Sequence, residues 1–151
     1  MDFFSKDQSF HTSSKYEPIY QFFNTKYKIG YKDLFLVCAA IGAKNDKRTQ
    51  PLDQKGREFR SSFFSDKERK LVYSIILNDE EKGKNLESFS NSEFPKVARK
   101  LLQEYAEGGM DLLIEKVFKE KWNGHSLDDD HDRYEIDLLK YILADYKEVP
   151  F

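Results

Sequence analysis

The stretch that decides the fold is residues 31–64, which read YKDLFLVCAAIGAKNDKRTQPLDQKGREFRSSFF. It contains an unbroken apolar run at residues 34–41. An apolar surface on all sides is typical of a helix that the rest of a domain encloses. The run therefore predicts the core helix of the protein, and Gly42 stands where a left-handed residue would end that helix.

A polar, mostly basic loop follows the core helix. Residues 44–60 carry six basic and three acidic side chains, a net charge of +3. The basic ones are Lys44, Lys47, Arg48, Lys55, Arg57 and Arg60. We expect this loop to be the working surface, in contact with nucleic acid or with a protein partner. It contains no arrangement of nucleophile, base and orienting group, so we predict no catalytic residue.

Composition sets the class of protein. With 151 residues, 39% of them hydrophobic and 15% aromatic, the chain predicts one compact domain with a real core. A net charge of −2 gives no general attraction to nucleic acid or to acidic membranes. The single cysteine, Cys38, falls within the apolar run, which indicates a reducing compartment. Without a signal peptide or a run of about 20 apolar residues, the sequence predicts a cytoplasmic protein that does not bind a membrane. We also predict no cofactor.

The first residues differ from the rest. Residues 1–13 are polar, are interrupted by Phe3, Phe4 and Phe10, and show no clear period. They predict a flexible N-terminal arm. The alternative is that the aromatic side chains dock on the domain or on a partner. We expect a single helical domain to occupy residues 14–151.

Helical signals recur through that domain. A first helix is expected after Ser14, where aromatic and aliphatic residues recur at steps of three and four. A capping box at Ser65 and Glu68 predicts the start of another. A further helix should begin near residues 91–92 and stop at Gly108 and Gly109, followed by a separate helix at residues 110–118.

The sequence therefore predicts a mainly α fold, a bundle of about six helices around a central buried one. No period-two alternation or internal repeat is evident in the sequence. An alternative within the 49–64 loop is a small β-hairpin, in which residues 58–60 would pair with residues 62–64, but we favour helical structure.

An acidic section precedes the last expected helix. His125, His131 and four aspartates lie within eight residues, at 125–132. They could bind a divalent metal, but their spacing matches neither a calcium loop nor a two-histidine helix motif. Acids at the start of a helix also complement its positive end. We favour that second interpretation and predict no metal site.

Two blocks of the sequence resemble a known family. The first is KDLFLVCAAIGAKNDKR, continued by Pro51-Leu52 and by REFRSSFF, and the second is EYAEGGMDLL at residues 104–113. They resemble the small proteins described as DNA phosphorothioation-associated, or Dnd system-associated, protein 4. The resemblance implies a bacterial cytoplasmic protein encoded beside DNA-modification or restriction genes of anti-phage defence. It implies no catalytic residue.

Three functions remain open at this point. The first, which we favour, is an accessory, non-catalytic subunit that acts as an adaptor for a larger protein component of the defence complex. The second is direct binding of duplex DNA, in which the six cations of the loop would touch phosphates and affinity would fall with salt. The third is a small metal-dependent nuclease built on Asp53, Lys55 and Glu58.

The distribution of charge leaves a plainer alternative for the loop. Residues 128–148 carry eight acidic and three basic side chains, a net charge of −5. The loop could therefore be an ordinary solvated segment in which Arg57 or Arg60 pairs with an acid of the C-terminal helix. The oligomeric state is not predicted by any of these patterns.

Overall fold

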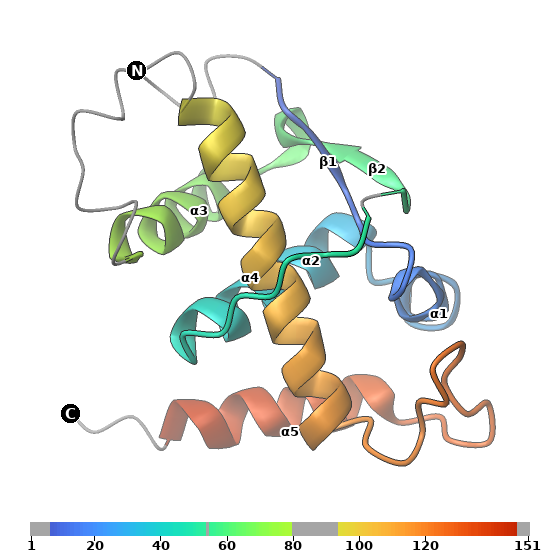
Figure 1. Ribbon diagram of the computed structural model, residues 1–151. Helices are drawn as coiled ribbons and strands as arrows, with labels where there is room; N and C mark the ends of the chain where they lie inside the picture. The colour runs from blue at the N-terminus through green and yellow to red at the C-terminus, as the bar shows by residue number, and fades with distance from the viewer. Residues whose placement is uncertain (1–6, 54, 80–93, 148–151) are drawn as a thin grey trace.

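The computed structural model describes residues 7–53, 55–79 and 94–147. Within them, five α-helices accompany one two-stranded antiparallel sheet (Figure 1). In chain order the elements are β1 (Ser9–His11), α1 (Glu17–Tyr27), α2 (Tyr31–Lys44), β2 (Glu58–Arg60), the 3-10 turn η2 (Ser61–Phe63), α3 (Asp66–Asn78), α4 (Phe94–Lys116) and α5 (Tyr134–Lys147). The expected mainly α class is confirmed. The described residues hold five helices instead of about six because two of the expected helices are one.

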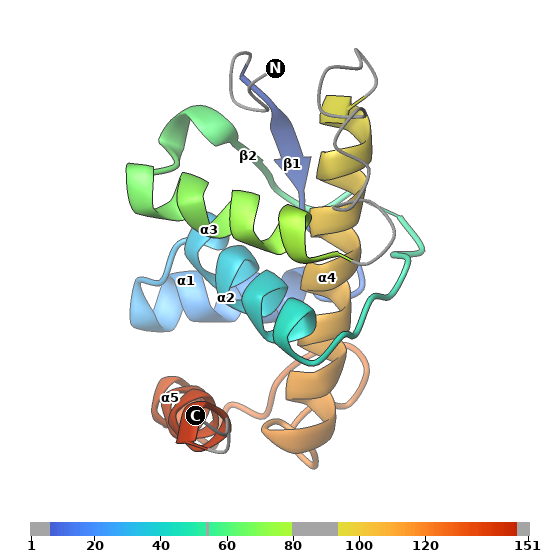
Figure 2. The ribbon, with the colours of Figure 1, turned by 90° about the vertical axis from the view of Figure 1, so that its left-hand side faces the viewer.

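Helix α2 is the core helix that its sequence predicts. Leu34, Phe35 and Cys38 are each at most 2% exposed. The helix contacts α1, α3 and α4, and its contact with α4 is the most extensive in the fold. Figure 2 shows α2 in the middle of the molecule, with α3 on one side of it and α5 on the other. The other helices are therefore arranged around α2.

The expected end of α2 at Gly42 is wrong. The helix continues to Lys44, and Asp46, with φ 52°, is the residue that takes the left-handed conformation after it. Gly42 instead faces α4 at close range. A Cβ atom at Gly42 would overlap the carbonyl group of Tyr105, with the carbonyl carbon at 2.9 Å. Glycine is present here because two backbones approach, not because the chain turns.

The expected break at Gly108 and Gly109 is wrong for the same reason. Both residues lie inside α4, which is a single helix of 23 residues. A Cβ atom at Gly109 would overlap the carbonyl group of Cys38 in α2, and one at Gly108 would overlap the carbonyl group of Lys47. These two glycines and Gly42 therefore allow α2 and the loop after it to lie directly against α4.

Strand β2 forms where the hairpin alternative places a strand, but its partner is different. Residues 58–60 pair antiparallel with β1, in the register Ser9↔Arg60, Phe10↔Phe59 and His11↔Glu58. The alternative hairpin with residues 62–64 is wrong, since Ser61–Phe63 forms a 3-10 turn. The sheet therefore joins the N-terminal segment to the segment before α3.

Phe10 shows that the N-terminal segment belongs to the core. Its side chain is fully buried and stacks on Phe59, with ring centroids 5.5 Å apart and planes inclined by 8°. It also contacts the rings of Phe35 and Phe64. Of the two interpretations of the expected arm, docking on the domain is the one that applies to residues 9–11. Phe3 and Phe4 lie outside the described residues.

The capping box at the start of α3 is confirmed. Ser65 Oγ accepts a hydrogen bond from Glu68 N at 3.2 Å, and Glu68 Oε1 accepts one from Ser65 N at 2.8 Å. Lys32 of α2 adds an ion pair to the same carboxylate, with Nζ 2.9 Å from Oε1. The cap thus also ties α3 to α2.

Replacing Ser65 by alanine should lower the free energy of unfolding by about 1 kcal/mol, because one backbone donor at the start of α3 loses its partner. Chemical denaturation measures this. The matched control is Ser62→Ala, which keeps the bond from the Ser62 backbone N–H to Asp7 and should change stability by less than about 0.5 kcal/mol. Equal stability of the two variants would contradict the role given to the cap.

Helix α5 is anchored by its first residue. Tyr134 is fully buried, its hydroxyl donates to the carbonyl of Asp128 at 2.7 Å, and its backbone N–H donates to the hydroxyl of Tyr27. Its ring packs edge-on against Phe22 and Phe118. This aromatic cluster places α5 across the C-terminal end of α4 (Figure 1). In the described part of the chain, no helix has the length and apolar character needed to cross a membrane.

Candidate functional site

The predicted basic loop crosses α4 on its way from α2 to β2 (Figure 1). At its centre, Thr49 N donates to the carbonyl of Glu104 in α4 at 3.0 Å. At its far end, Gly56 N donates to the carbonyl of Thr12 at 2.9 Å. The loop backbone is therefore fixed at both points, and its side chains have defined neighbours.

Arg48 is engaged in a network inside the protein. Its Nη1 lies 3.5 Å from Asp79 Oδ1, at the end of α3, and 4.0 Å from Glu104 Oε1. Asp79 is 4% exposed and also accepts a hydrogen bond from the hydroxyl of Tyr105 at 2.7 Å. A buried carboxylate requires such partners. The Arg48 guanidinium therefore compensates a buried charge, which gives it a structural role.

Arg57 and Arg60, at the other end of the loop, also have partners. Arg60 Nε lies 2.7 Å from Asp7 Oδ2 and its Nη1 lies 2.9 Å from Glu58 Oε1. The hydrogen bond from Arg60 is the main reason that the pKa of Asp7 is lowered. Arg57 places its guanidinium 4.9 Å from the ring centroid of Tyr31. In the described residues the acids around Arg60 thus come from the N-terminal segment and β2, not from the C-terminal helix.

The three lysines of the predicted surface are exposed. Lys44 and Lys47 lie at the end of α2, whereas Lys55 lies near β2. The structure therefore distributes the six predicted cations over both ends of the loop. Of these cations, Arg48 and Arg60 form ion pairs with acids of the same molecule, and Lys44 also has an interaction partner.

A second basic surface was not predicted from the sequence. A hollow of about 300 Å³ lies where the loop meets the N-terminal half of α4. It is lined by Gln50, Pro51, Lys96, Arg99, Lys100, Gln103 and Glu104. The three cations are spaced i, i+3 and i+4, which places them on one face of a helix. That spacing is the signal that could have identified them; no comparable signal indicates that the loop forms the opposite wall.

Residues 12–17 form a polar clasp between the loop and α4. Ser13 Oγ donates to Glu107 Oε1 at 2.8 Å, and Ser14 donates to Asp53 through both N and Oγ. The hydroxyl of Tyr16 donates to Asp111. Glu107 is 8% exposed, and its burial raises its pKa to about 7. The clasp therefore surrounds the carboxyl group of Glu107, which is partly protonated near neutral pH.

The residues considered for a nuclease are directed to different partners. Asp53 accepts hydrogen bonds from Ser14 and from Lys55 N, and Glu58 pairs with Arg60 and lies 3.6 Å from His11. Across residues 7–53, 55–79 and 94–147, no group of three or more His, Cys, Asp or Glu side chains is arranged to hold a metal ion.

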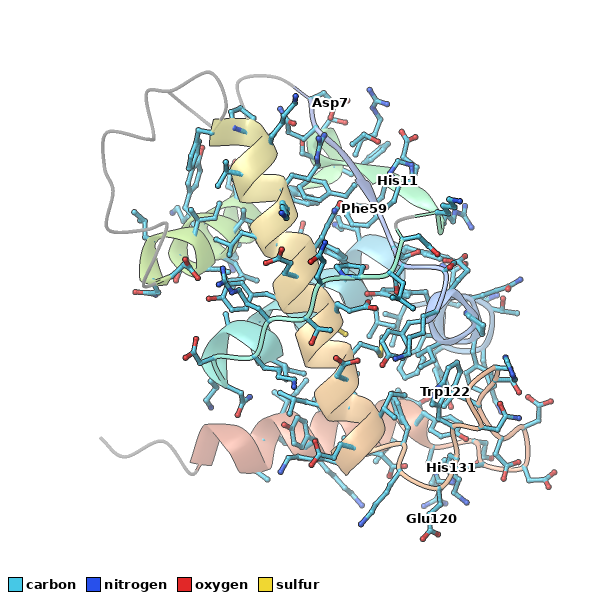
Figure 3. The ribbon with its side chains drawn as sticks, viewed as in Figure 1. Asp7, His11, Phe59, Glu120, Trp122 and His131 are labelled. Carbon is cyan, nitrogen blue, oxygen red and sulfur yellow. The ribbon has the colours of Figure 1, made fainter. Side chains whose placement is uncertain are left out.

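The acidic section before α5 forms a folded turn. Trp122 and Leu127 form a β-bridge. The side-chain oxygen of Asn123 accepts hydrogen bonds from the backbone N–H groups of His125 and Ser126. His131 Nε2 lies 2.6 Å from Asp137 Oδ2, in the first turn of α5. Figure 3 shows His131 and Trp122 in this segment, far from Asp7 and His11 on the sheet side of the molecule.

Helix α5 has a second apolar face, which points to solvent. Its inner face is anchored by Tyr134 and Leu138, both buried. Ile136, Leu139 and Leu143 are 41%, 54% and 51% exposed. Their spacing of three and four residues puts them on one stripe, which we call the outer face of α5. Large exposed apolar side chains grouped in this way are typical of interaction surfaces.

An apolar hollow separates α5 from the core helix. It has a volume of about 390 Å³ and lies between α2, α3 and α5. Its lining includes Leu36, Val37, Ala40 and Ile41 of α2, Leu71 of α3 and Ile142 of α5. The side of α2 that faces α5 is therefore less tightly covered than the side that meets α4.

Comparison with known proteins identifies the family of the chain. A comparison with the curated proteins finds no match, and one with the solved structures finds none either. Residues 21–127 match the family model described as DNA sulphur modification system-associated protein 4. The match includes the basic loop and the cations of α4, ends before α5 begins, and confirms the resemblance seen in the sequence. The chain therefore belongs to the DNA sulphur modification system-associated protein 4 family.

Proposed function

We propose that this protein is an accessory, non-catalytic subunit of a DNA sulphur modification or restriction system and acts as an adaptor that docks on a larger protein component. The family description supports the association with such a system. The observation that carries the adaptor role is the outer face of α5, three large apolar side chains left exposed on an otherwise well-anchored helix.

The surroundings of that face define the chemistry of the partner. The exposed acids Asp128, Asp129, Asp130 and Asp132 precede α5 directly. A partner surface that fits is an apolar groove with a basic rim, since an amphipathic helix binds by placing its apolar face into such a groove. Opposite charges at the rim would raise the association rate and fix the orientation.

The test is to replace the outer face and measure binding to the candidate partners. In the variant I136S/L139S/L143S, affinity for a co-expressed protein component of the system should fall roughly a hundredfold or more, because three buried apolar contacts are lost. Isothermal titration calorimetry with the purified component measures the affinity. Circular dichroism should show unchanged helix content.

The control variant is Leu52→Ser, which removes a side chain that is 92% exposed and lies outside α5. It should bind as the parent protein does. Unchanged binding of the triple variant would reject the outer face of α5 as the docking surface, and failure of every protein component of the system to bind would reject the adaptor role. A parent dimer that the triple variant abolishes would assign the face to a second copy.

A further inference from the structure

The cations of α4 are chemically available, in contrast to several of those in the loop. Among the described residues, the side chains of Lys96, Arg99 and Lys100 make no ion pair, hydrogen bond or ring contact. Arg48 and Arg60 are held by acids of the same molecule. A ligand would thus not have to break existing ion pairs to reach the α4 cations.

The hollow beside these cations also presents polar groups. Gln103 is 5% exposed, and within the described part of the chain its amide has no hydrogen-bond partner. Gln50, on the loop side, lines the same hollow. The Gln103 amide is not among the buried polar atoms that lack a partner, so it reaches the space of the hollow. The amide of Gln103 therefore marks a position where an external acceptor could bind.

Among the described residues, acidic side chains do little to cancel this charge. Glu104 is the one acid that they contribute to the lining of the hollow, and it lies within ion-pair distance of Arg48. The acidic section before α5 lies at the opposite end of α4 (Figure 1). The N-terminal half of α4 therefore carries a local positive field, although the net charge of the whole chain is −2.

From this arrangement we infer that the face of α4 formed by Lys96, Arg99 and Lys100, with the amides of Gln50 and Gln103, binds the phosphodiester backbone of DNA. Lysine and arginine neutralise phosphate charge and release counterions, while neutral amides donate hydrogen bonds to phosphate oxygens. One helix face supplies the cations and the fixed loop supplies the second wall. Such contacts position a protein on DNA without reading its sequence.

The same protein would then hold two partners on different surfaces. The N-terminal half of α4 lies toward one end of the molecule and α5 lies toward the other (Figure 1). An adaptor with this arrangement could keep a protein component close to DNA. The DNA-binding inference does not rest on the adaptor role, since the two surfaces share no residue.

The experiment is fluorescence anisotropy with a labelled duplex oligonucleotide of random sequence, repeated from 20 to 200 mM salt. The parent protein should bind with an affinity that falls as salt rises. The variant K96Q/R99Q/K100Q should bind at least tenfold more weakly at low salt. Its logarithmic salt slope should be smaller by roughly 2 to 3, because each phosphate contact contributes about 0.9 to the slope.

Two control variants make the result specific. K116Q/K119Q/K121Q removes the same formal charge at and beyond the other end of α4, and it should retain the parent affinity within about threefold. K47Q/K55Q tests the exposed cations of the loop and should have a smaller effect than the α4 variant. No binding by the parent protein at 20 mM salt would overturn the inference.

Other outcomes would overturn it as well. If K116Q/K119Q/K121Q weakens binding as much as the α4 variant, the affinity reflects total charge and not this face. If K47Q/K55Q alone removes binding, the loop is the contact surface. If polyglutamate binds as tightly as the duplex, the face fits an acidic protein and not a phosphodiester backbone. Equal helix content of all variants by circular dichroism excludes loss of folding as the cause.

Discussion

Replacing Gly109 by alanine should lower the free energy of unfolding by about 3 kcal/mol or more, enough to threaten the fold of a domain whose total stability is about 5–15 kcal/mol. The new Cβ would overlap the carbonyl group of Cys38, with the carbonyl carbon at 2.7 Å. Cys38 is fully buried in the middle of α2. Relief of the clash requires α2 and α4 to separate, which opens the core on both sides. Thermal or urea denaturation measures the loss.

The sign of the change in unfolding free energy distinguishes an effect of helix packing from an effect of helix propensity. In the interior of a free helix, alanine is about 1 kcal/mol more favourable than glycine. If the two helices were not in close contact, Gly109→Ala would therefore stabilise the protein. The control is Gly30→Ala, before α2, where the new methyl group would meet only the side chain of Asp33 at 3.2 Å. A Gly109→Ala variant as stable as this control would contradict the close contact of α2 and α4.

Replacing Glu107 by glutamine should stabilise the protein above neutral pH. Burial raises the pKa of Glu107 from 4.5 to about 7. The folded state therefore binds a proton more tightly than the unfolded state between these two values. The stabilising contribution of this group is complete below pH 4.5 and is lost as pH rises through 7. Glutamine stays neutral throughout and can still accept the hydrogen bond of Ser13.

The difference in unfolding free energy between Glu107→Gln and the parent protein should be near zero at pH 4 and about 3 kcal/mol at pH 8, since one pKa unit corresponds to about 1.4 kcal/mol. Urea denaturation at a series of pH values measures it. Glu120→Gln, at an exposed glutamate, is the control and should show no such rise. A difference that stays constant from pH 4 to pH 8 would show that burial does not shift the titration of Glu107.

Features with a local cause could be predicted from the sequence. The capping box depends only on Ser65 and Glu68, three residues apart, and it forms as expected. The core helix follows from an apolar run with no polar face, and residues 34–36 are accordingly buried. In both cases the physical cause lies within a few residues of the structure it produces.

The glycines show where local reasoning fails. A glycine at the end of an apolar run and a glycine at a helix crossing have the same local signature, because both lack a Cβ atom. What distinguishes them is the carbonyl group opposite, supplied by Tyr105 for Gly42 and by Cys38 for Gly109. These partners are distant in sequence. The extra helix end expected at Gly108 and Gly109 follows from that missing information.

The candidate site was incomplete for a related reason. The sequence groups cations by their position in the chain, and it groups Lys44 with Arg60 although they lie at opposite ends of the loop. The structure pairs Arg48 with Asp79 and Arg60 with Asp7, acids that lie far along the chain. The spacing of Lys96, Arg99 and Lys100 was visible, but the loop that forms the other wall of their hollow was not. The pairing of β2 with β1 in the N-terminal segment could not be predicted from the sequence either.

The position of Phe10 has a consequence for synthesis of the protein on the ribosome. This ring is translated before Phe35, Phe59 and Phe64, on which it packs. Ser13, just after it, needs Glu107, which is made later still. During synthesis the apolar Phe10 side chain therefore stays exposed until residue 64 has been made, and the segment is fixed at Ser13 only after residue 107. Transient exposure of this kind is what chaperones recognise.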